Sequence, residues 1–228
     1  MTFSDLHNEC SDFSQSIHQA ALEPHLEEEA LNQLCDTSRY YNFGGLCTNL
    51  IRLPKARKRL GVSSQVKLIA VIDFPFGGLP TSLKKKEAEW AASHGAEELD
   101  IVPNLFALSQ GETNLFAEEI ADLCGLDLPV RVILDLSQLS KTTLSLAIEA
   151  SIEAGVYGIQ TGNGFGPGVS KKQVQEITEL IKGRCSIKAV GGIKTINHAI
   201  DLIEAGANHL GTSSGTKLIN ELRQLNKQ

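Results

Sequence analysis

Short apolar runs alternate with longer amphipathic stretches along almost the whole chain. Between the short runs, apolar positions recur with a helical period, as at residues 81–94 and 140–154. Buried strands separated by amphipathic helices predict a parallel sheet, because parallel neighbours need a crossover connection. The short runs fall at 16–22, which is the weakest, and at 45–49, 67–73, 98–102, 130–136, 158–161, 186–190 and 208–212.

Glycines mark where several helical stretches end. Gly95, Gly155 and Gly206 each follow a helical stretch and precede a short apolar run. They are predicted to end these helices, where a left-handed residue is needed. Eight strand–helix units in 228 residues favour a closed (β/α)8 TIM barrel, with an open doubly wound sheet as the alternative. We expect a short N-terminal extension over residues 1–12 and one barrel domain over residues 13–228.

Composition and charge narrow the class of protein. The chain is 42% hydrophobic and 21% charged, which is typical of a globular protein, and it carries a net charge of −6. A negative chain is a poor nucleic-acid binder, and its one basic run, at 84–90, is expected to form a solvated helix face. No stretch has the length of a membrane span or the apolar core of a signal peptide. Five widely spaced cysteines without a CxxC pair predict reduced thiols and a cytoplasmic protein, and the scattered histidines predict no metal site.

Three polar residues interrupt otherwise apolar strands. Asp100, Gln160 and Lys188 are each flanked by apolar residues, and alternation predicts that all three face the barrel axis. A buried lysine and a buried aspartate indicate either a functional site or a structural ion pair. Asp135 is a fourth candidate, unless it caps the loop after its strand. Cys47 is expected to be a small core residue and not a nucleophile, because no histidine is expected at a comparable strand position.

Two glycine-rich segments follow the last two predicted strands. In a TIM barrel, the loops after strands 7 and 8 commonly form a phosphate site, where free backbone N–H groups meet a helix N-terminus. We therefore expect Gly191, Gly192, Ser213 and Ser214 to bind phosphate, although the hydroxyl residues could simply cap the last helix. The loop at 161–168, which includes Gly164, could close over a sugar or line the same pocket.

These segments resemble the deoxyribose-phosphate aldolase family of class I aldolases. The resemblance covers roughly residues 13–217 and is carried, in order, by GLCTN, GAEELDIVPN, QTGNGFGPG, IKAVGGIKT and EAGANHLGTSSG. It implies a (β/α)8 barrel, aldol cleavage of 2-deoxyribose 5-phosphate through a lysine Schiff base, and no metal or organic cofactor. It also implies a phosphorylated sugar or similar small anion as the ligand, and a homodimer, although no residue pattern identifies an interface.

The resemblance assigns residues individually. Asp100 matches the family's proton-relaying aspartate, and Lys188 matches a second lysine that lowers the pKa of the Schiff-base lysine. The Schiff-base lysine itself falls on Gln160, whose amide nitrogen is not a nucleophile. Lys194 matches a position usually held by arginine. Further departures from the family pattern are His18, Ala20, Asp73, Gly162 and Asn163.

Three functions are consistent with these residues. The protein could be an aldehyde-lyase in which Lys188 is the amine nucleophile and Asp100 transfers protons. It could be an aldolase-derived barrel that binds a phosphosugar without turnover, as a regulatory or interaction protein. It could also catalyse a non-covalent reaction, such as an enolisation polarised by Lys188.

Overall fold

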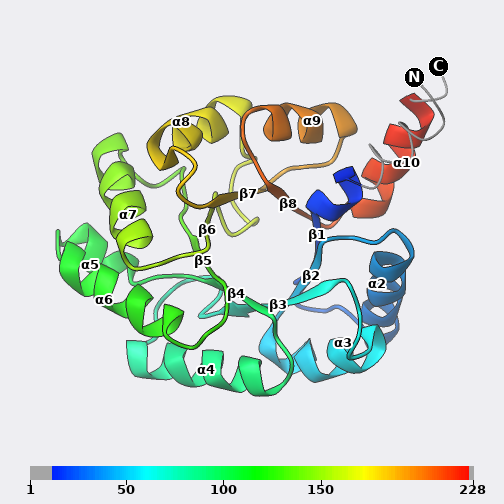
Figure 1. The fold of residues 1–228 in the computed structure, drawn as a ribbon, viewed down its shortest axis with the longest axis horizontal. Coiled ribbons are helices and arrows are strands. Elements are labelled where there is room, and N and C mark those ends of the chain that lie inside the picture. The colour runs from blue at the N-terminus through cyan, green and yellow to red at the C-terminus, as the bar shows by residue number, and fades with distance from the viewer. Residues whose placement is uncertain (1–11, 226–228) are drawn as a thin grey trace.

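The computed structural model describes residues 12–225, and these form a closed barrel of eight parallel strands surrounded by helices (Figure 1). The strands follow one another around the barrel in chain order, and β8 pairs with β1 to close it. Their bounds are β1 Ile17–Ala21, β2 Gly45–Thr48, β3 Lys67–Ile72, β4 Glu98–Ile101, β5 Val130–Ile133, β6 Gly158–Gln160, β7 Ser186–Val190 and β8 His209–Thr212.

The predicted TIM barrel is therefore confirmed, and the weak first run does form a strand. Residues 1–11, which make up most of the expected N-terminal extension, lie outside the described residues, so the domain boundary stays a prediction. The helices are α2 Glu28–Tyr40, α3 Leu53–Leu60, α4 Thr81–Ser93, α5 Leu105–Ser109, α6 Thr113–Cys124, α7 Lys141–Glu153, α8 Lys171–Ile181, α9 Ile196–Glu204 and α10 Gly215–Leu225, with a 3₁₀ turn at Leu50–Arg52.

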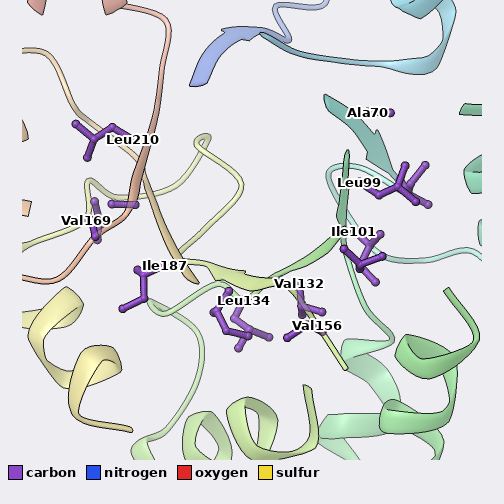
Figure 2. Packing of buried hydrophobic residues seen from close by; sticks show 14 of the residues in the cluster. Ala70, Leu99, Ile101, Val132, Leu134, Val156, Val169, Ile187 and Leu210 are labelled. Atoms are coloured by element: carbon purple, nitrogen blue, oxygen red, sulfur yellow. The ribbon is translucent and has the colours of Figure 1, made fainter. Parts of the chain in front are cut away.

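Alternation along each strand separates an apolar outer layer from a more polar axis. Leu99, Ile101, Val132 and Ile187 are buried on the side of the strands that faces the helices (Figure 2). Their neighbours in the sequence therefore point toward the barrel axis. This is the geometry that turns isolated polar residues such as Asp100 and Lys188 inward.

Glycines end three of the helices as predicted. Gly95, Gly155 and Gly206 have φ angles of +88°, +90° and +114° and lie just beyond α4, α7 and α9. At Gly206 a Cβ would also come within 2.3 Å of the Thr178 hydroxyl, so both the backbone conformation and the packing require glycine there.

The basic run on α4 corrects one expectation. Lys84 is fully buried, together with Ala88 and Ala91 on the same face of the helix. Its ammonium donates to the Val102 carbonyl and to Glu119 of α6, at 3.0 and 2.8 Å. The prediction that the basic run is solvated is therefore wrong for Lys84, although Lys86 is exposed.

Candidate active site

A chain of charged side chains crosses the barrel axis. Arg131 on β5 donates to Glu98 and, at 2.8 Å, to Asp100, both on β4. The other oxygen of Asp100 accepts a hydrogen bond from Lys188 on β7. All of these except the half-buried Glu98 are fully buried or nearly so. Two cations and two anions thus balance one another inside the barrel, as buried charges must.

The electrostatics keep Asp100 ionised. Burial disfavours a carboxylate, but the positive charges of Lys188 and Arg131 outweigh it and hold the pKa of Asp100 below its usual value. The Cys47 thiol lies 3.6 Å from Asp100, and burial raises its pKa to about 12. Cys47 is therefore a protonated thiol in the barrel interior and a poor nucleophile, in keeping with the small core residue expected there.

A cavity of about 300 Å³ opens at the carboxyl end of the strands. Its floor is formed by His18, Cys47, Gln160 and Lys188, and its rim by the loops after β6, β7 and β8. Gln160 and Lys188 are register partners on neighbouring strands, so their side chains lie next to each other. The Gln160 amide donates to the Gly162 carbonyl at 2.8 Å, and its carbonyl oxygen has no hydrogen-bond partner within residues 12–225.

Two glycine-rich loops form one side of the rim. Gly191 and Gly192 have φ angles of +116° and +68°, and a Cβ on either would come within 3.0 Å of the loop that contains Pro167 and Gly168. Gly211 on β8 leaves space for the side chains of Val190 and Lys188, because a Cβ there would lie 2.6 Å from the Val190 Cγ2 and 3.1 Å from the Lys188 Cε. The rim side chains on these loops are Lys194, Ser213 and Ser214.

Two histidines stack beside the charged chain. The rings of His18 on β1 and His209 on β8 have centroids 4.3 Å apart and an interplanar angle of 24°. Burial lowers the pKa of both, helped by the charges of Lys188 and Arg131, to about 4 for His209 and well below the usual value for His18. Both rings are therefore neutral at pH 7.

Comparison with known proteins agrees with the geometry. Deoxyribose-phosphate aldolase from Microcystis aeruginosa is 36% identical over 222 residues, covering 97% of this chain and 96% of that protein. Deoxyribose-phosphate aldolase from Thermococcus gammatolerans is 34% identical over 218 residues, covering 93% and 97%. The chain belongs to the deoxyribose-phosphate aldolase family. No protein-family model matches it.

Solved structures of aldolases share the fold. The aldolase QR15 superposes with a TM-score of 0.87 at 36% identity, covering 95% of this chain and 96% of that one. A tetrameric deoxyribose phosphate aldolase from Aeropyrum pernix gives 0.86 at 28% identity, covering 99% and 100%. A homodimer of the present chain stays a prediction.

The structure brings most of the predicted site residues together. Gln160, Lys188, Gly164, Gly191, Gly192, Ser213 and Ser214 all line the cavity, and Asp100 pairs with Lys188 beneath it. Asp135 does not line this cavity and instead lines a second pocket that shares Gly164 with it. Its carboxylate accepts hydrogen bonds from the Ser137 amide and hydroxyl at 3.0 and 2.6 Å, so it caps the loop after β5, which was the alternative for this residue.

Three contributors were missed in the sequence. Arg131 interrupts an apolar strand just as Asp100 does, so the same signal could have identified it. His18 and His209 lie at inward strand positions, and the premise that no histidine does so is wrong. Within the described residues no group of acidic, histidine or cysteine side chains could hold a metal ion, and no helix is long and apolar enough to cross a membrane.

Proposed function

We propose that this chain is a phosphosugar-binding member of the aldolase family that does not form a Schiff base at residue 160. The observation that carries the proposal is the pairing at the cavity floor. Gln160 lies where the resemblance assigns the Schiff-base lysine, and the neighbouring Lys188 is bonded to Asp100.

Neither side chain offers a free amine. The nitrogen lone pair of an amide is delocalised, so Gln160 can donate and accept hydrogen bonds but cannot attack a carbonyl. The Lys188 nitrogen is already engaged as a hydrogen-bond donor to the buried Asp100 carboxylate. Lys188 therefore serves as a cationic donor that binds and polarises an oxygen of the ligand.

The opposite side of the cavity suits a phosphate. Gly191 and Gly192 form a tight turn with positive φ angles, and α10 begins directly after Ser213 and Ser214. A helix N-terminus and free amides favour an anion, and Lys194 adds a positive charge to the rim. A cavity with a phosphate site at the rim and hydrogen-bonding groups at the floor fits a short phosphorylated sugar.

Borohydride trapping combined with calorimetry tests the proposal. The wild-type protein should bind 2-deoxyribose 5-phosphate or a related phosphosugar, and borohydride should leave its intact mass unchanged. A reduced adduct mapped to Lys188 would show that this lysine is a nucleophile and would overturn the non-covalent assignment. Absence of binding to every phosphosugar would overturn the ligand class.

The variant Gln160→Lys restores an amine to the cavity floor. If position 160 is the lost Schiff-base site, borohydride with 2-deoxyribose 5-phosphate should yield an adduct at that position. Gln65→Lys is the matched control, because it adds the same side chain at an exposed position before β3. An adduct at position 160 and none in the control would show that one substitution removed the covalent chemistry.

A further inference from the structure

The floor of the cavity contains hydrogen-bonding capacity that the described part of the protein does not use. His18, Gln160 and Lys188 all line the cavity, and they are 2%, 4% and 2% exposed. Buried polar atoms normally have partners, and an unpaired one costs free energy. Unused hydrogen-bonding capacity at these three floor residues therefore indicates a ligand group that would satisfy it.

His18 is held in place without a hydrogen bond from the described residues. Its ring stacks on His209, and its Nδ1 is enclosed and unpaired within residues 12–225. Because burial and the nearby cations lower its pKa, the ring is neutral at pH 7. A neutral imidazole has one donor and one acceptor nitrogen, so it matches a group that can itself donate and accept.

Gln160 and Lys188 narrow the chemistry of that group. The Gln160 nitrogen already donates to Gly162, so the unsatisfied atom is its carbonyl oxygen, which can only accept. Lys188 has three ammonium hydrogens, of which Asp100 takes one. The floor thus contains an unpaired acceptor on Gln160 that needs a donor, and beside it the Lys188 cation, which favours an oxygen atom of the ligand.

We propose that the cavity floor recognises a hydroxyl group on the sugar carbon beside the carbonyl, so that the ligand is a fully hydroxylated sugar phosphate and not a 2-deoxy sugar phosphate. A hydroxyl donates one hydrogen bond and accepts others, whereas a carbonyl oxygen can only accept and a methylene does neither. His18 and Gln160 are the specificity-determining residues. This inference rests on the proposed function, because it assumes that a phosphosugar occupies the cavity.

The presence or absence of this hydroxyl group should change the affinity of the sugar phosphate strongly. A site built to bind a hydroxyl discriminates strongly against the analogue that lacks it, because the buried groups of the site are then left unpaired. We expect ribose 5-phosphate to bind about 10- to 100-fold more tightly than 2-deoxyribose 5-phosphate.

Titration calorimetry on the full chain with these two sugars and with inorganic phosphate tests the proposal. The preference for ribose 5-phosphate would support it. Equal affinities, or a preference for the deoxy sugar, would overturn it while leaving the proposed function intact. If neither sugar binds more tightly than inorganic phosphate, both the inference and the proposed function fail.

The variant His18→Phe tests the assignment to specific residues. Phenylalanine keeps a ring that can stack on His209 but has no ring nitrogens, so the preference should fall to within about threefold. His94→Phe makes the same change outside the cavity and should keep the wild-type preference. A preference that survives His18→Phe in a folded protein would overturn the role of His18.

Discussion

Two of the lysines within residues 12–225 are buried, and their surroundings differ. Lys84 lies between α4 and α6, which pack side by side outside the sheet (Figure 1). Its ammonium donates hydrogen bonds to the Val102 carbonyl and to Glu119 at 3.0 and 2.8 Å, and it forms an ion pair with Asp73 at 3.3 Å. Lys84 therefore has two hydrogen bonds and two carboxylate partners within the protein.

Lys188 is buried to the same degree but has a single partner, Asp100, among the described residues, and it adjoins a cavity. The comparison shows that a buried charge does not by itself mark a functional site. What distinguishes Lys188 is the combination of open space and hydrogen bonds not yet made. Lys84 instead fixes the loop after β3, because Asp73 also accepts from the Leu79 amide.

The largest expected effect is the difference in stability between variants that lack one or the other buried lysine. Lys84→Met leaves Glu119 and Asp73 buried without their cation, so the free energy of unfolding should fall by about 3–5 kcal/mol. Lys188→Met leaves Asp100 paired with Arg131, so the loss should be smaller, about 1–3 kcal/mol. Urea denaturation monitored by circular dichroism measures both.

Ligand binding should show the opposite order. Phosphosugar affinity should fall for Lys188→Met and stay near wild-type for Lys84→Met under conditions where both proteins are folded.

The double variant Lys84→Met with Glu119→Gln should regain part of the stability that Lys84→Met loses, because it removes one of the two carboxylates left without a cation. The contrast between the two lysines would be contradicted if Lys188→Met proved the more destabilising change.

The second expected effect is a pH dependence of the free energy of unfolding, which arises from the two stacked histidines inside the barrel. Because burial lowers the pKa of His18 and His209, their folded-state values lie below the unfolded value of about 6.5. The unfolded chain then binds protons first as the pH falls. Stability is therefore complete above about pH 6.5 and should decrease toward about pH 4, by about 3 kcal/mol from His209 alone and further from His18.

Urea denaturation at a series of pH values tests this. The double variant His18→Phe with His209→Phe keeps two stacked rings and removes both titrating groups, so its stability should vary less between about pH 7 and pH 4. An unchanged pH dependence in the double variant would show that other groups control it.

Much of the fold and part of the site follow from local patterns. Alternation within strands was enough to predict that Asp100, Gln160 and Lys188 face the axis. The same argument applied to Arg131 would have completed the charged chain. The burial of Lys84 could also have been predicted, since Lys84 shares a helix face with Ala88 and Ala91 at spacings of four and seven residues.

Other features depend on closure of the barrel. His18 and His209 are 191 residues apart in the sequence and stack because β8 pairs with β1. Which atoms of His18 and Gln160 remain unpaired depends on side-chain orientation, and no sequence pattern encodes that. The cavity floor is therefore the part of the site that needed the structure.

The smallest expected effect concerns Asp135, the second carboxylate near a strand end. Asp135→Ala removes the acceptor for the Ser137 amide and hydroxyl, so stability should fall by only about 0.5–1.5 kcal/mol. Ser137→Ala removes one of the same hydrogen bonds from the other side and is the matched control. Phosphosugar affinity should stay within about twofold of wild-type in both variants, since neither residue lines the main cavity. Should affinity fall tenfold for Asp135→Ala alone, this carboxylate would have to be counted with Asp100 as part of the binding site, because a lost loop cap would affect both variants alike.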